Sequence, residues 1–385
     1  MEHRTIYKQN GWYTPFPQLN LMPDGNLAVG VNSSPFTDHY LIGDWKVLVS
    51  EDEGSTWHES GDSNISHNWN ASGVREKYDR YTETQKDGTL LSVGSVGWKE
   101  WPKNRQDEIE SVGVLIKDHP GDSSKFVSGW NQLFIQQSED AGKTWNRREY
   151  TIPDVNHTMA FPRPIKLTTG TILIPVGSHK EASGSQDIPG VRAKRTANNF
   201  FVWRSVDSGN TFHLFPAGSP ICTQEAAFVE LTSGMILCLI RSEPESGYLL
   251  EMRSDDDGKT WSWPIESQIW APHSPPHLLK LRDGRILCSY GFRESPMGIR
   301  AVISHDDGLS WDIDNTYTLR DDGGYVGHTQ KEKNAPDYLA EFEWKGSSDI
   351  GYPQSLELSD GSILTVYYIT LDDNITHAAC TRWEL

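Results

Sequence analysis

The sequence predicts an all-β protein, a six-bladed β-propeller of four-stranded antiparallel blades, and three observations support this fold class. An eight-residue pattern built around Asp and Gly occurs five times, and a short turn ending in Gly occurs six times. The last unit of the chain lacks one strand, while the N-terminus holds a strand with no neighbour in sequence to pair with. Repetition of one supersecondary unit around a ring explains all three. We therefore expect one propeller domain over residues 1–385.

The eight-residue pattern is Ser-x-Asp-x-Gly-x-(Thr/Ser)-(Trp/Phe), and its copies occupy residues 50–57, 138–145, 205–212, 254–261 and 304–311. In each copy the Asp can accept hydrogen bonds from the turn backbone, and the Gly can adopt a positive φ. The aromatic residue can pack on the neighbouring strand. The pattern therefore predicts a hairpin turn in every copy.

The Gly turns join two apolar stretches each, and their glycines are Gly25, Gly88, Gly170, Gly234, Gly284 and Gly361. Each unit then consists of a strand, a Gly turn, a strand, a variable loop, a strand, the Asp-containing turn and a last strand. This order predicts a four-stranded antiparallel sheet. Six such sheets make six blades.

The sixth unit, residues 351–385, departs from the repeat. It has three strand-like segments, at 352–358, 363–370 and 377–384, and no Asp pattern. The N-terminal segment, residues 4–8, precedes the first blade and has nothing else to pair with. We expect it to supply the outer strand of the last blade, which closes the ring and covers two exposed sheet edges.

Charge and hydropathy exclude several function classes. The chain has 35 Lys plus Arg against 53 Asp plus Glu, a formal net charge of −18, which disfavours nucleic acid and anionic lipid as partners. Residues 1–4 lack the apolar core of a signal peptide, and no apolar run reaches the roughly 18 residues of a membrane span. We expect no membrane insertion, and a cytoplasmic protein, or a secreted or periplasmic one whose leader has been removed.

Four cysteines are too few for a disulfide scaffold. Cys238 and Cys288 lie inside apolar runs and are expected to be buried, reduced thiols. No Cys or His spacing is typical of a metal site, so we expect neither a metal nor a cofactor.

The five Asp-containing patterns resemble the Asp boxes of the sialidase (neuraminidase) superfamily, and the repeats extend from about residue 12 to 385. The resemblance implies the six-bladed fold. It also implies a retaining exo-glycosidase that removes a terminal acidic sugar of the sialic acid type from a glycan. Asp boxes occur in propellers with other activities too, so the reaction has to be argued from the site.

The topology separates two ends of the propeller. Gly turns and Asp boxes lie at one end, and the long irregular segments lie at the other, at 58–77, 97–130, 179–199 and 319–349. Variable loops on one rim of a rigid scaffold are typical of a binding site. These segments carry aromatic residues that either stack on sugar rings or anchor the loops: Trp69, Trp98, Trp101, Trp130 and Trp344.

The rim ends of the inner strands are found by counting nine residues back from each Gly, which gives Phe16, Asp79, Phe161, Glu225, Pro275 and Tyr352. In sialidases a Glu and a Tyr begin two inner strands, the Glu accepts the Tyr proton, and the phenolate attacks the anomeric carbon. The resemblance implies that Glu225 is the base and Tyr352 the nucleophile. A neutral Tyr avoids repulsion from an anionic sugar, and an adjacent base compensates for its ordinary pKa near 10.

Sialidases also bind the substrate carboxylate with three arginines, and bidentate guanidinium groups suit a planar anion. Arg241 and Arg293 match two of them, and Arg300 is a rival to Arg293 that is better explained as an outer-strand residue. The first arginine belongs to a Tyr-Arg-Ile-Pro motif, whereas this chain has no Arg within residues 12–17. Arg163 could substitute from the third blade.

The general acid of sialidases is an Asp in the first-blade loop. Asp38 is the first candidate and Asp44 the second, while Asp79, at the start of an inner strand, is a further candidate or a substrate-binding residue. Four histidines near the rim are better explained as polar lining than as metal ligands: His157, His179, His273 and His277.

Two other functions remain open. A glycosidase of the same fold that acts on a sugar other than sialic acid is favoured by the missing first arginine. A propeller that binds glycans without cleaving them would bind sugar with no turnover, and the pairing of Tyr352 with Glu225 argues against it.

Overall fold

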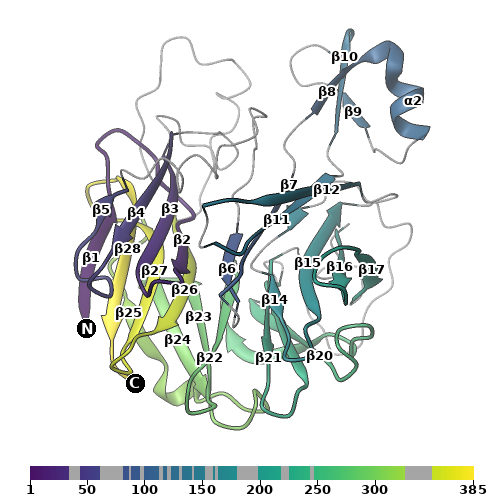
Figure 1. The fold of residues 1–385 in the computed structure, drawn as a ribbon. Helices are drawn as coiled ribbons and strands as arrows, with labels where there is room; N and C mark the ends of the chain where they lie inside the picture. The colour runs from purple at the N-terminus through teal and green to yellow at the C-terminus, as the bar shows by residue number, and fades with distance from the viewer. Residues whose placement is uncertain are drawn as a thin grey trace.

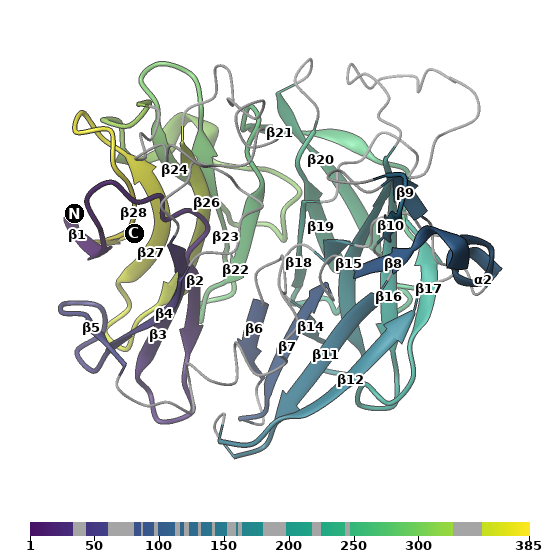
Figure 2. The same ribbon diagram turned by 90° about the horizontal axis from the view of Figure 1, so that it is seen from above.

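The computed structural model describes most of the propeller, namely residues 1–33, 44–60, 81–85, 88–95, 99–111, 116–118, 123–129, 132–140, 143–151, 159–160, 164–179, 198–217, 225–242, 247–325 and 349–385. Within these residues the strands form six antiparallel blades and one additional small sheet (Figure 1). Viewed from above, the blades follow one another around a ring (Figure 2). The predicted fold class is therefore confirmed.

Consecutive segments of the chain build consecutive blades. Blade one is β2 (Gln18–Leu21), β3 (Leu27–Ser33), β4 (Asp44–Ser50) and β5 (His58–Glu59), and blade two is β6 (Tyr81–Thr84), β7 (Leu90–Ser95), β11 (Gln132–Ser138) and β12 (Asn146–Thr151). Blade three has an interrupted inner strand, β13 (Met159–Ala160) and β14 (Ile165–Lys166), followed by β15 (Ile172–His179), β16 (Asn198–Ser205) and β17 (His213–Pro216).

Blades four to six complete the ring. Blade four is β18 (Ala226–Glu230), β19 (Ile236–Ile240), β20 (Tyr248–Ser254) and β21 (Ile265–Trp270), and blade five is β22 (Pro276–Lys280), β23 (Ile286–Phe292), β24 (Gly298–Ser304) and β25 (Tyr317–Arg320), with a short 3₁₀ helix, η2 (Ile313–Asn315), before β25. Blade six is β26 (Ile350–Glu357), β27 (Ile363–Thr370), β28 (Thr376–Trp383) and β1 (Glu2–Tyr7).

The N-terminal strand closes the last blade, as the sequence predicts. β1 pairs antiparallel with β28, with Glu2 opposite Arg382 and Arg4 opposite Cys380. The sheet order is β1, β28, β27, β26, so both ends of the chain meet in one blade. Hydrogen bonding between the first and last segments of the chain protects the edge that β28 would otherwise expose.

The core lies between neighbouring blades. All five residues of β19 are buried, because each face of this strand contacts another blade. One apolar cluster joins Leu19 and Val29 of blade one to Leu364 and Val366 of blade six. Burial of these side chains stabilises the ring by removing apolar surface from water.

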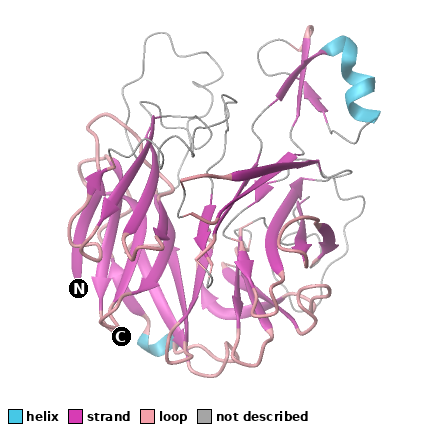
Figure 3. Ribbon diagram, in the orientation of Figure 1, coloured by secondary structure: helices cyan, strands magenta, loops and turns pink. Residues whose placement is uncertain are grey.

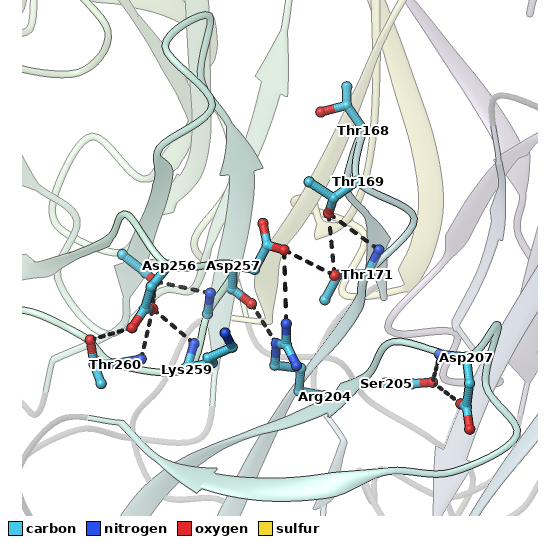
Figure 4. Close-up of polar contacts among 12 residues, drawn as sticks. Thr168, Thr169, Thr171, Arg204, Ser205, Asp207, Asp256, Asp257, Lys259 and Thr260 are labelled. Atoms are coloured by element: carbon cyan, nitrogen blue, oxygen red, sulfur yellow. Dashed lines mark hydrogen bonds and ion pairs between the residues drawn. The ribbon is translucent and has the colours of Figure 1, made fainter.

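The Asp boxes form the predicted turns. In the box of blade four, Asp256 accepts hydrogen bonds from the backbone N–H of Thr260 at 2.9 Å and from the Thr260 hydroxyl at 2.7 Å (Figure 4). It also accepts one from the Ser254 hydroxyl at 2.9 Å. Gly258 has φ +80°, and the preceding Asp257 also has a positive φ, +60°. The second left-handed residue is a feature that the pattern alone does not reveal.

The Asp box also connects two blades. Arg204 of β16 donates from Nε to the backbone oxygen of Asp257 at 2.8 Å, and the Thr171 hydroxyl reaches the Asp257 carboxylate at 3.3 Å (Figure 4). A Cβ on Gly258 would lie 2.8 Å from a methyl group of Leu173, so Gly allows the turn to approach blade three closely. Each such turn can thus close a hairpin and fasten its blade to the previous one.

The structural role of the Asp box leads to a prediction about stability. We expect Asp256→Ala to lower the free energy of unfolding by about 1–3 kcal/mol, because several turn hydrogen bonds are lost together. Denaturant unfolding measures the change, and Asp255→Ala, at the exposed position next to it, is the matched control. Activity per folded molecule should stay close to that of the unmutated protein. A large loss of turnover at unchanged stability would contradict a structural role.

The segment 97–130, which the sequence analysis treats as irregular, contains secondary structure of its own. It holds β8 (Lys99–Pro102), the 3₁₀ helix η1 (Lys103–Arg105), α2 (Gln106–Ser111), β9 (Ile116–Asp118) and β10 (Phe126–Gly129). The three strands form a separate sheet in the order β8, β10, β9, beside α2, which is the cyan helix at the upper right of Figure 3. Strands of three or four residues are too short to produce a recognisable period, so the prediction was wrong here.

Three cysteines lie in the described residues, Cys238, Cys288 and Cys380, and all three are buried free thiols. This confirms the expectation for Cys238 and Cys288. Burial raises the pKa of the Cys380 thiol to about 12. Among the described segments, no helix has the length and apolar character needed to cross a membrane.

Candidate active site

Two predicted residues meet at the rim end of the inner strands. Glu225 immediately precedes β18, and Tyr352 lies near the start of β26. The Tyr352 hydroxyl donates a hydrogen bond to Oε1 of Glu225, although 127 positions separate the two residues in the chain. The structure thus places a phenol directly on a carboxylate.

The backbone at Tyr352 is unusual. Gly351 has φ +136° and Tyr352 has φ +50°, and the pairing of β26 with β27 shifts register between Gly351 and Gln354. A left-handed conformation is costly for a bulky residue and is maintained only when the surroundings enforce it. A bulge of this kind redirects a side chain away from the ordinary alternation of a strand.

Arg241 lies beside Glu225 because the two residues are cross-strand neighbours. The backbone N–H of Arg241 donates to the backbone oxygen of Glu225 at 2.9 Å, extending the ladder between β18 and β19. Opposite residues on an antiparallel pair project to the same face. Arg241 Nη1 accordingly reaches Glu225 Oε2 at 2.5 Å, and the two side chains are only 23% and 13% exposed.

Arg293 follows β23 and connects blade five to blade six. Its Nε donates to the backbone oxygen of Ile350 at 3.0 Å, and its Nη1 donates to the backbone oxygen of His273 at 2.5 Å. Its Nη2 donates to the Tyr368 hydroxyl at 3.2 Å. One of these acceptors, Ile350, lies two residues before Tyr352, so Arg293 holds the segment that carries the phenol.

Three aromatic rings meet on the blade-one side of the pair. The centroid of the Phe16 ring lies 4.6 Å from that of the Tyr352 ring and 5.1 Å from that of the Tyr368 ring, and both contacts have edge-to-face geometry. Tyr352 and Tyr368 are 6.0 Å apart. Phe16, like Tyr352, has a positive φ, +52°. Phe16 and Tyr352 also share the same distance to their Gly turns, so equivalent positions of two blades face each other.

The position expected for the first arginine is occupied by neutral residues. Thr14 is fully buried, and its hydroxyl lies 2.9 Å from that of Ser33. The adjacent Tyr13 is also buried and donates from its hydroxyl to Oδ1 of Asp349 at 2.8 Å. This buried Tyr–Asp pair joins blade one to the residue just before β26.

The environment favours the neutral form of the phenols. Burial and then the negative charge of Glu225 raise the pKa of Tyr352 well above its ordinary value, while Arg241 and Arg293 act to lower it. Burial also raises the pKa of Tyr368 to about 12. Tyr352 therefore keeps its proton at neutral pH until a base accepts it.

The remaining predicted residues have different outcomes. Asp38, Asp79 and Arg163 lie outside the described residues, and Asp44 begins β4 with only its backbone described. Arg300 is buried in β24, donates to the backbone oxygen of Pro296 at 3.0 Å and lies 4.9 Å from the Phe292 ring. β24 pairs with both β23 and β25, so Arg300 lies on the third strand of blade five and the outer-strand interpretation from the sequence is wrong by one strand.

The rim aromatics and histidines are only partly described. Trp69, Trp98, Trp130, Trp344 and His157 lie outside the described residues, and Trp101 and His179 are described by their backbone alone. The backbone oxygen of His273 binds Arg293, and His277 Nδ1 accepts from the backbone N–H of Ser355 at 3.3 Å. In the part of the chain that is described, no group of three His, Cys, Asp or Glu side chains is placed to hold a metal ion.

Four residues of the site were missed from the sequence: Tyr13, Phe16 as a site residue, Asp349 and Tyr368. Phe16 appears in the set counted back from the Gly turns, but an apolar side chain suggested no chemistry. Tyr368 could have been found from register, since it lies opposite Gly351 across β26 and β27.

The fold and this cluster define a propeller with a tyrosine, a carboxylate and two arginines gathered at one end. The chain belongs to the BNR repeat-like domain family, whose pattern matches residues 115–365. A search of curated proteins returned no match.

Solved structures extend the likeness in fold to the whole chain. A protein of unknown function from Dyadobacter fermentans superposes with a TM-score of 0.70 at 20% identity, covering 100% of this chain and 98% of that one. The NanB sialidase of Streptococcus pneumoniae superposes at 0.59 and 14% identity, over 98% of this chain and 70% of that one. A leech intramolecular trans-sialidase does so at 0.58 and 14%, over 100% and 70%. The fold is therefore that of the sialidases.

Proposed function

We propose that this protein is a retaining exo-glycosidase that removes a terminal sugar from a glycan, with Tyr352 as nucleophile and Glu225 as its base. The observation that carries the proposal is the hydrogen bond from the Tyr352 hydroxyl to Glu225, made at the rim between strands of two different blades. A nucleophile in contact with a base that is itself held by a third group is the arrangement that covalent catalysis needs. Arg241 is that third group.

The reaction would proceed by two displacements. The Tyr352 oxygen attacks the anomeric carbon, its proton passes to Glu225, and the bond to the leaving oxygen breaks as that oxygen takes a proton from a general acid. Asp38 remains our candidate for this acid. Water then cleaves the sugar–tyrosine bond and the protons return, so the anomeric configuration of the product equals that of the substrate.

The cations beside the pair would assist the first displacement. Negative charge develops on the phenol oxygen as its proton leaves, and Arg241 and Arg293 both favour the charged form of Tyr352. Fixed charges at the place where charge develops stabilise a transition state without reorganisation. The sequence prediction of an acidic sugar assigns these same arginines to the substrate carboxylate, which is a question about the sugar and separate from the reaction.

A screen of aryl glycosides tests the reaction class. We expect hydrolysis of at least one glycoside in a panel that includes a sialoside and neutral sugars of both anomeric configurations. Proton NMR of the first product should show retention. Inversion would remove Tyr352 as nucleophile, and binding of sugars without any turnover would favour a glycan-binding propeller instead.

A further inference from the structure

The charges around Tyr352 balance one another. Glu225, Arg241 and Arg293 act on the Tyr352 hydroxyl, and Asp349 acts with Glu225 and Arg293 on the neighbouring Tyr368. Among the side chains that the structure describes here, two carboxylates thus face two guanidinium groups. We propose that the site accepts a terminal sugar that carries no carboxylate, and that Arg241 and Arg293 are positioning residues; this inference rests on the proposed function.

Arg241 is committed to Glu225. The contact of 2.5 Å between Nη1 and Oε2 is a charge-assisted hydrogen bond, and backbone pairing fixes the two residues opposite each other. A substrate carboxylate on Arg241 would compete with Glu225 for the same guanidinium group. The sugar would then weaken the contact that orients the base.

Arg293 is committed to the protein as well. A guanidinium group has five N–H donors, and Arg293 uses three of them, on the backbone oxygens of Ile350 and His273 and on the Tyr368 hydroxyl. A Cβ on Gly351 would lie 3.4 Å from Arg293 Nη2, so the guanidinium also lies against the left-handed residue before Tyr352. These contacts hold the bulge that presents the nucleophile.

A third carboxylate, brought by the sugar, would be poorly compensated. An acidic sugar would add a negative charge to the balanced set formed by Glu225, Asp349, Arg241 and Arg293, inside a protein whose formal net charge is −18. Transfer of a carboxylate from water to a partly buried site is unfavourable unless a cation pairs with it fully. A neutral sugar requires no such partner.

The described residues of blade one at this site, Tyr13, Thr14 and Phe16, are neutral. Thr14 is buried and its hydroxyl is hydrogen-bonded to that of Ser33, and Tyr13 is buried and donates a hydrogen bond to Asp349. Phe16, two residues after Thr14, is half-buried and contacts both Tyr352 and Tyr368. An aromatic ring provides a surface for the C–H bonds of a sugar and none for a carboxylate.

Matched substrates test the class of sugar. Aryl glucosides and galactosides of both configurations are compared with the corresponding glucuronides and galacturonides, which differ only by the carboxylate, and with an aryl sialoside. We expect kcat/KM to be at least about tenfold higher for a neutral sugar than for any acidic one, because the carboxylate of an acidic sugar would compete for arginines that are already paired. A preference for an acidic sugar overturns the inference and leaves the glycosidase proposal standing.

Arg293→Lys distinguishes positioning from clamping. A positioning role predicts a fall in kcat of about 10–100-fold on the best neutral substrate, with KM changed by no more than about threefold. If Arg293 instead binds the substrate carboxylate, the variant should raise KM for acidic substrates only. Arg285→Lys, at an exposed Gly turn where Arg285 pairs with Asp283, is the control and should leave both constants unchanged.

If no glycoside in the panel is cleaved, the proposed reaction fails, and binding still tests the inference. Calorimetry then compares free glucose and galactose with glucuronic, galacturonic and sialic acids. Binding of a neutral sugar alone supports the inference. Binding of an acid in preference, or of neither class, overturns it.

Discussion

Tyr352→Phe should lower kcat by about three to five orders of magnitude on the glycoside that is cleaved best, because the substitution removes the oxygen that we propose attacks the sugar. Phe keeps the ring, so the edge-to-face contacts with Phe16 should persist and the protein should remain folded. Steady-state kinetics on the best substrate measures the change, and thermal unfolding checks the fold.

Tyr317→Phe is the matched control. Tyr317 lies on the outer strand β25, where its ring contacts Trp383, and loss of its hydroxyl should leave kcat unchanged. Residual activity of Tyr352→Phe within about tenfold of the unmutated protein would show that another group attacks the sugar, or that water does so directly.

Glu225→Gln should lower kcat by about two to four orders of magnitude, because the amide cannot accept the Tyr352 proton as attack proceeds. Burial holds the pKa of Tyr352 well above its ordinary value, so the phenol cannot supply enough phenolate without a base. The amide is close in size to the carboxylate, which limits structural damage at this rim position.

Glu230→Gln is the control on the same strand. Glu230 lies at the opposite end of β18, where its carboxylate accepts the backbone N–H of Thr168 at 2.9 Å. Its loss can affect stability but should leave kcat per folded molecule intact. Equal losses of turnover in both variants would mean that Glu225 acts through the fold and has no role as a base.

The double variant provides a stricter criterion. We propose that Tyr352 and Glu225 take part in one proton transfer, so the double variant should be about as slow as the slower single variant. If the fold-losses of kcat in the two single variants multiply in the double variant, the two residues contribute to separate steps.

Much of the candidate site follows from strand register. Glu225 and Arg241 lie opposite each other because the turn at Gly234 sets the pairing of β18 with β19, and both ends of that hairpin can be counted in the sequence. Tyr352 was found by the same count from Gly361. Register is a local property of a short hairpin, so residues joined through it are predictable.

The blades follow from residue types and their spacing along the chain. The Asp of each box bonds to residues two to four positions away, as Asp256 does with Ser254 and Thr260, and the missing fourth strand of the last unit required β1. Hydrogen bonds over such short spans depend on residue type and spacing, and both can be recognised in a repeated sequence pattern.

The charges of the site, in contrast, depend on contacts between residues far apart in the chain. The Tyr13–Asp349 bond spans 336 positions and the Tyr352–Glu225 bond 127, and Arg293 is bound by acceptors from two blades. Two of those acceptors are backbone oxygens, which every residue possesses and which carry no signal in a sequence. Whether an arginine binds the substrate or other groups of the protein depends on which acceptors the folded ring brings within hydrogen-bond distance. Spacing along the chain does not contain that information.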